Sequence, residues 1–129
     1  MNEVTIWETK EVPVNFDHLD PNDRFHDWQR TAKAQLEHAA NMTLNDWIGV
    51  DEDGHPNDDF LGVEYIISNS GEYRHVILLC AFGGPNCYLY TEKCEYHLYW
   101  AGTKWHVAID TKICQAIDEY FEQMWETFQ

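Results

Sequence analysis

The sequence predicts an α+β fold in which one helix precedes an antiparallel meander of four to five strands and a second helix follows it. Apolar residues recur every three to four positions in the first third of the chain, alternate over about residues 62–109, and return to helical spacing near the C-terminus. The turns between the alternating segments are short, and short connections require neighbouring strands to be antiparallel. Two amphipathic helices can then cover one face of the sheet.

The first helix is expected over about residues 21–41, after an extended arm or edge strand formed by residues 1–18. Asp20 is a suitable N-cap and Pro21 suits the first helical position. Pro13 argues against a central strand because proline has no N–H to donate. The apolar positions of this helix are Phe25, Trp28, Ala32, Leu36 and Ala39.

The strands are separated by turns rich in Gly, Asn and Ser. Gly83 and Gly84 are expected to form a turn that needs positive φ, closed by Pro85. A last helix is expected over about 111–128, beginning near Asp110. The strand candidates are residues 62–68, 73–80, 87–91, 94–100 and 104–109.

The length and composition indicate one folded, strongly acidic domain of 129 residues with a net charge of −15. Residues 1–72 hold 16 acids and 4 bases, whereas residues 73–109 hold 2 acids and 3 bases. No segment has the roughly 18–20 apolar residues that span a membrane, and the first residues lack a secretory signal. We therefore expect a location in the cytoplasm, reduced cysteines, no membrane contact and no direct binding to nucleic acid.

The acidic residues concentrate in one loop and on one helix face. Seven acids lie within residues 46–64, and four on the last helix fall between roughly 140° and 240° when Ile113 is placed at 0°. Like charges at i,i+4 on that helix each cost about 0.2–0.5 kcal/mol. We expect these acids to bind a partner, although a solvated loop and a solvated helix face are the alternatives. The candidate partner-binding residues are Asp46, Asp51, Glu52, Asp53, Asp58, Asp59, Glu64, Asp118, Glu119, Glu122 and Glu126.

Calcium is a second interpretation of the loop, since Asp51, Asp53 and Gly54 are spaced partly like a calcium loop. The glycine comes too early, however, and position twelve from Asp51 is Gly62 instead of Glu. These departures exclude an EF-hand and leave only an irregular weak site.

Other chemistry is weakly supported, so we expect no enzyme, no cofactor and no bound metal. The seven histidines form no His-x-x-x-His pair, but alternation places His97 and His106 on consecutive strands, where they could meet. A metal site there, or a nucleophile formed by a histidine with Cys80, Cys87 or Cys94, remains an alternative.

Aromatic residues of the predicted strands form a further candidate surface. Tyr88 and Tyr90 share one face of their strand, while Tyr96 and Trp100 share one face of the next. One aromatic face is expected to pack on the helices, and the other could stay open for a protein contact. A homodimer through this face or the sheet edge is compatible with the sequence.

The segment 82–86 (Phe-Gly-Gly-Pro-Asn), the strand residues Tyr88 to Tyr90, the Tyr99-Trp100 pair and the acidic last helix resemble small acidic proteins of phages and mobile elements. The resemblance covers about residues 76–126. In size and acidity the chain is also similar to anti-restriction and anti-CRISPR inhibitors, many of which present carboxylates where a nuclease expects phosphates. This resemblance implies a non-enzymatic, DNA-mimic phage protein that evades host defence by binding a CRISPR effector or restriction enzyme.

Overall fold

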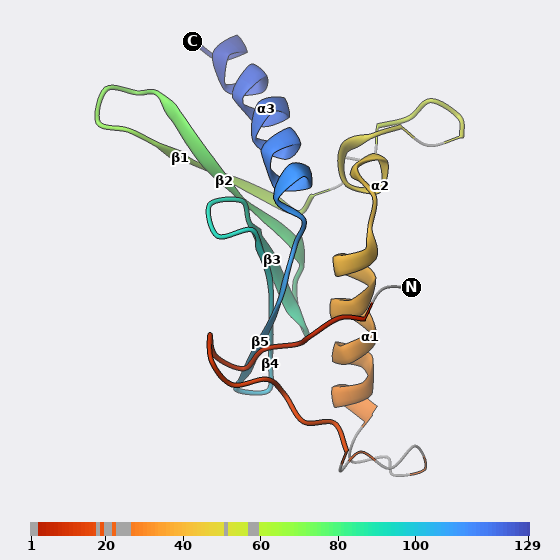
Figure 1. Cartoon of the computed structure of the whole chain (residues 1–129). Coiled ribbons are helices and arrows are strands. Elements are labelled where there is room, and N and C mark those ends of the chain that lie inside the picture. The colour runs from red at the N-terminus through yellow and green to blue at the C-terminus, as the bar shows by residue number, and fades with distance from the viewer. Residues whose placement is uncertain (1–2, 18, 20–21, 23–26, 51, 57–59) are drawn as a thin grey trace.

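A computed structural model of the chain describes residues 3–17, 19, 22, 27–50, 52–56 and 60–129. It confirms the predicted α+β arrangement: five strands form one antiparallel sheet in chain order, between an N-terminal and a C-terminal helix (Figure 1). The elements are α1 (Asp27–Asn41), α2 (Leu44–Ile48), β1 (Gly62–Ile67), β2 (Tyr73–Ala81), β3 (Asn86–Tyr90), β4 (Glu95–Trp100), β5 (Thr103–Ala108) and α3 (Thr111–Thr127).

Both long helices pack on the same face of the sheet. On α1, Trp28 stacks on Trp105 of β5 with ring centroids 5.6 Å apart, and on α3, Phe121 meets Tyr65 of β1 at 6.2 Å. Alternate residues of the strands point into this covered face, and the register shifts between Ile66 and Ile67 and between Leu79 and Ala81. Its fully buried side chains include Leu36, Val76, Leu78, Leu89, Leu98, Val107 and Ile117.

The turn chemistry agrees with the sequence at both ends of the sheet. Gly83 and Gly84 have φ values of +104° and +134°, which side chains with a Cβ rarely adopt, and the side chain of Asn86 accepts a hydrogen bond from the Gly83 N–H at 2.8 Å. Asp110 caps α3 by accepting from the Lys112 N–H at 2.7 Å. The short connections therefore fix the register of the meander.

The N-terminal arm lies beside the β5 edge. The backbone of Trp7 donates to and accepts from His106 of β5, with both N···O distances at 2.8 Å, and the side chain of Ile6 is buried in the core. The predicted helix start at Asp20 and Pro21 lies outside the described residues.

None of the helices in the described part of the chain combines the length and apolar character that crossing a membrane requires.

Candidate functional site

The acids of the loop occupy different surroundings in the structure. Asp46 belongs to the capping box of α2: its carboxylate accepts from the Thr43 N–H at 2.9 Å, which lowers the pKa of Asp46. Glu52 and Asp53 are exposed in the turn after α2. Asp51, Asp58 and Asp59 lie outside the described residues.

Glu64 belongs to a different surface from the loop acids. It lies on β1 opposite Ile77 of β2 and is exposed. Its charge helps to raise the pKa of Tyr90, after burial and the hydrogen bond with Tyr99. Glu64 therefore borders the uncovered face of the sheet.

On α3, Asp118 is turned toward the sheet, and this corrects its predicted place in the outer acidic stripe. Its Oδ1 accepts from the Tyr73 hydroxyl at 2.6 Å and the Thr91 hydroxyl at 2.8 Å, and its Oδ2 lies 3.2 Å from Nδ1 of His75. The side chain is only 21% exposed. Its helical angle borders the apolar sector, so polar groups beneath the helix can capture it. Burial and the hydrogen bond from its hydroxyl to Asp118 raise the pKa of Tyr73.

Of the remaining stripe residues, Glu119 and Glu126 are exposed on α3, whereas Glu122 is half-buried. Glu122 and Glu126 line a hollow of about 340 Å³ together with Glu72 of the β1–β2 turn. This turn and the loop after α2 lie on opposite sides of α3 in Figure 1. The hollow and the exposed loop acids therefore lie on opposite sides of α3. Glu72, which the helical spacing did not include, joins Glu122 and Glu126 in the hollow.

Two ion pairs of arginine and lysine lie elsewhere, on α1. Arg30 pairs with Asp27, and the Lys33 ammonium lies 2.6 Å from Glu37. The first helix therefore balances its own charges, as the i,i+4 spacing of Lys33 and Glu37 predicts.

The face of the sheet opposite the helices carries a cluster of rings, as the alternation of the strands indicated. Tyr88 and Tyr99 meet edge to face at 5.8 Å, and Tyr90 meets His97 at 4.8 Å. Lys93 lies over the ring of Tyr90 at 5.7 Å and Lys104 over that of Tyr99 at 5.5 Å. We call this surface the aromatic face; it comprises Tyr88, Tyr90, His97, Tyr99 and His106.

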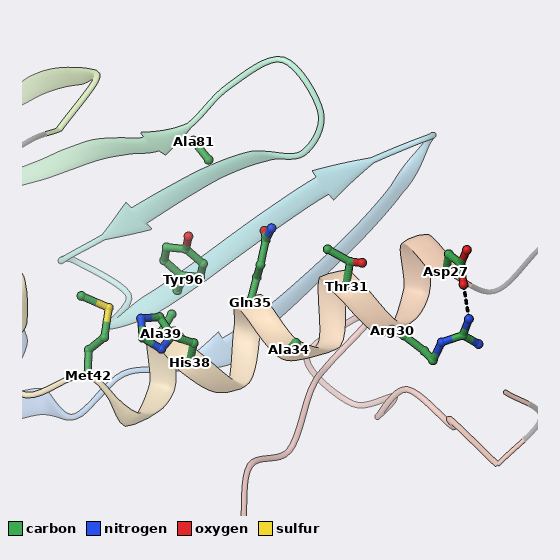
Figure 2. A pocket seen from close by; sticks show the side chains of 10 residues that line it. All are labelled: Asp27, Arg30, Thr31, Ala34, Gln35, His38, Ala39, Met42, Ala81 and Tyr96. Atoms are coloured by element: carbon green, nitrogen blue, oxygen red, sulfur yellow. Dashed lines mark hydrogen bonds and ion pairs between the residues drawn. The ribbon is translucent and has the colours of Figure 1, made fainter. Parts of the chain in front are cut away.

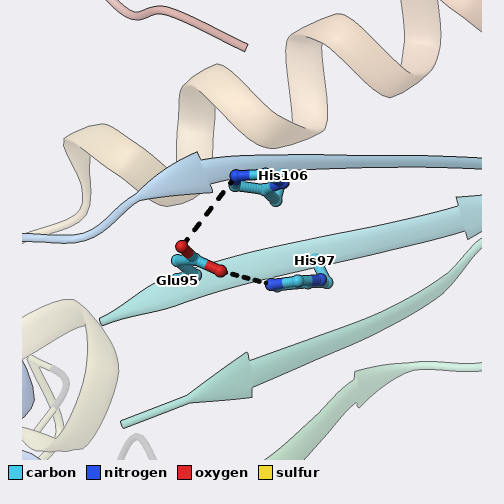
Figure 3. A group of neighbouring side chains, drawn as sticks. All are labelled: Glu95, His97 and His106. Atoms are coloured by element: carbon cyan, nitrogen blue, oxygen red, sulfur yellow. Dashed lines mark hydrogen bonds and ion pairs between the residues drawn. The ribbon is translucent and has the colours of Figure 1, made fainter. Parts of the chain in front are cut away.

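Beside these rings, Glu95, His97 and His106 converge (Figure 3). Nε2 of His97 lies 2.8 Å from Oε1 of Glu95, and Nε2 of His106 lies 3.9 Å from Oε2 of the same carboxylate. Burial lowers the pKa of both histidines, although Glu95 opposes the shift. The sequence predicted that His97 and His106 could meet, but Glu95 was missed; its position two residues before His97 was the available signal.

The cysteines do not join these histidines. Cys87 is buried on the face that the helices cover, whereas His97 and His106 lie on the aromatic face. Burial raises the pKa of the Cys80 thiol to about 12 and also raises that of Cys87. Cys87 therefore does not form a Cys/His nucleophile with His97 or His106.

A groove of about 780 Å³ runs along α1 (Figure 2). Ala39, Met42 and Tyr96 lie toward one end of it, and the Asp27–Arg30 pair lies at the other. Its apolar end suits an apolar segment better than a charged ligand.

Comparison with protein-family models, curated proteins and solved structures gives no match to this chain.

Proposed function

We propose that the protein is a non-enzymatic inhibitor that binds the basic, nucleic-acid-binding surface of another protein. In this mechanism the carboxylates on and beside α3 pair with Lys and Arg side chains that would otherwise hold phosphates. The observation that carries the proposal is that Glu72, Glu122 and Glu126 line one hollow beside α3. Glu119 is exposed and lies seven residues, about two helical turns, before Glu126 on the same face of α3.

Two features of this acidic surface support a cationic partner. Glu122 and Glu126 are a like-charge i,i+4 pair, which is unfavourable in an isolated helix. Both lie in the C-terminal half of α3, where the helix dipole favours cations. A partner that supplies Lys and Arg would relieve both effects, and its association would be fast and sensitive to salt.

The target that we propose is a nuclease of host defence in the cytoplasm, either a CRISPR effector or a restriction enzyme. This narrower choice rests on the resemblance to small acidic phage proteins. The broader class rests on charge, because a groove that binds duplex DNA must present cations at close spacing.

The test is the triple reversal E119K/E122K/E126K, with E3K/E8K/E11K on the exposed arm as its control. Each triple changes the net charge from −15 to −9, so only the position of the charge differs. We expect the α3 triple to abolish binding to the target within a panel of purified restriction nucleases and CRISPR effectors, and the arm triple to retain it. Equal loss from both would contradict a defined acidic site. If E122K impairs folding, E119K/E126K against E8K/E11K gives the same comparison.

The aromatic face favours a second candidate, a protein contact that depends little on charge. Its tyrosines are half-buried and contact one another, His97 and the lysine side chains, and both long helices lie on the other side of the sheet. Aromatic residues are enriched at the centres of protein interfaces. Substitution of Tyr90 and Tyr99 by alanine would then abolish partner binding while the α3 triple retained it.

A further inference from the structure

The three side chains Glu95, His97 and His106 are held together by strand pairing. His97 of β4 lies directly opposite His106 of β5, and Glu95 lies two residues before His97. Residues at these positions share one face of the sheet, with directly opposite Cβ atoms about 4.5–5.5 Å apart. The backbone thus brings two imidazoles and a carboxylate to one place without a mobile loop.

The donor atoms also lie close to one another. One potential ligand atom from each of the three residues lies within 4.8 Å of the others, and the two rings are nearly parallel, 17° apart, with centroids at 5.0 Å. In a tetrahedral zinc site with bonds of about 2.0–2.1 Å, donors lie about 3.3 Å from one another. Side-chain rotations that move each donor by on the order of 1 Å would close the site.

We propose that Glu95, His97 and His106 bind one divalent transition-metal ion of the zinc type, with a further coordination position open to solvent. Two imidazoles and one carboxylate suit zinc and its neighbours, whereas Mg²⁺ and Ca²⁺ require mainly oxygen ligands. The opening is the hollow of about 280 Å³ beside Glu95 and His106, which Trp7 and Lys10 also line.

The surroundings limit the affinity of this site. To bind through Nε2, His97 must carry its proton on Nδ1, a buried atom for which the structure describes no hydrogen-bond partner. Metal-binding histidines ordinarily donate that proton to a second group. Lys93 and Lys104 also place positive charge near His106. We therefore expect micromolar binding, well short of the affinity of structural zinc sites. This inference is independent of the proposed docking of α3.

The experiment uses the full chain, freed of metal by a chelator and kept reduced, and titrates it with Zn²⁺ by calorimetry. We expect one site per chain with a micromolar dissociation constant. His97→Gln, His106→Gln and Glu95→Gln should each weaken it by at least about 10–100-fold, because even the loss of a group that only hydrogen-bonds a metal ligand costs this much. His38→Gln, on the exposed side of α1, should leave it unchanged. Binding that persists in both His97→Gln and His106→Gln would overturn the proposal.

A second measurement does not depend on the folding of the variants. Co²⁺ added to the unsubstituted protein should give the visible spectrum of a nitrogen- and oxygen-ligated ion, without a thiolate charge-transfer band. The ¹⁵N signals of two imidazoles should shift on addition of Zn²⁺. Thiolate ligation, shifts confined to other histidines, or no binding up to about 100 times the expected micromolar dissociation constant would each contradict the site.

Discussion

His97 and His106 stack across β4 and β5 with their ring centroids 5.0 Å apart, and both approach the single carboxylate of Glu95. The pair lies on the face of the sheet that the helices leave uncovered, yet both residues are buried. Neighbouring rings therefore remove them from water. Two stacked imidazoles in such a place are more stable neutral than charged.

Stability should consequently decrease as the pH falls. Burial holds the folded pKa of His97 below its ordinary value of 6.5. At pH values between the folded pKa of His97 and 6.5, the unfolded chain binds more protons than the folded protein. The free energy of unfolding therefore falls as the pH decreases through this range. Urea unfolding at pH 7.5, 6.5 and 5.5 should show a smaller loss for His97→Gln than for the unsubstituted protein. The same loss in both would show that His97 does not contribute.

Asp118 should stabilise the folded protein, unlike the exposed acids of α3. Asp118→Ala removes the acceptor of the half-buried Tyr73 hydroxyl, and we expect a loss of about 1–3 kcal/mol. The substitution costs less at Thr91, because its hydroxyl can donate its hydrogen bond to the Val76 carbonyl at 3.1 Å instead. Denaturant unfolding measures the effect, and Glu119→Ala on the exposed side is the control.

A double-mutant cycle isolates this hydrogen bond. Asp118→Ala combined with Tyr73→Phe should cost less than the sum of the single substitutions, by at least about 0.5 kcal/mol. Additive losses would mean that Asp118 acts through other contacts.

The thiols of Cys80, Cys87 and Cys114 should react slowly in the folded protein. Burial raises the pKa of each, that of Cys80 to about 12, and the thiolate is the reactive form. Labelling with a disulfide reagent at pH 8 should modify these three slowly in buffer and rapidly in urea, with the labelled positions identified by mass spectrometry. Rapid labelling of Cys87 in the folded state would contradict its burial.

The fold was predictable because its apolar residues recur regularly, at every second position in the strands and every three to four positions in the helices. Alternation defined the strands to within one or two residues, and the spacing of Ile113, Ile117 and Phe121 defined α3. Gly83 and Gly84 marked a turn with positive φ as expected. These features depend on local preferences and on one buried face, both of which a sequence records directly.

The candidate sites were less predictable because they depend on contacts between distant segments. The helical angle of Asp118 placed it just outside the apolar sector, and nothing in that angle reveals Tyr73 and Thr91 beneath it. Glu95 joins His97 and His106 only through the β4–β5 register, which the turn after Trp100 fixes. The hollow that unites Glu72 with Glu122 likewise depends on the packing of α3 over β2.

Salt dependence should separate the two candidate functions. If the carboxylates beside α3 make the contact, the dissociation constant should rise steeply from low to high salt, because exposed charge pairs are screened over about 8–10 Å. If the tyrosines of the aromatic face make it, the constant should change little. Titration of the same partner at several salt concentrations distinguishes these outcomes.

We propose that this protein occupies the place of nucleic acid on its target. The most direct test of this proposal is the affinity for a captured nuclease, measured with increasing concentrations of duplex DNA. We predict that the apparent dissociation constant rises with DNA occupancy, and that saturating protein prevents DNA binding in turn. A ternary complex in which DNA stays bound and the affinity is unchanged would contradict the proposed function.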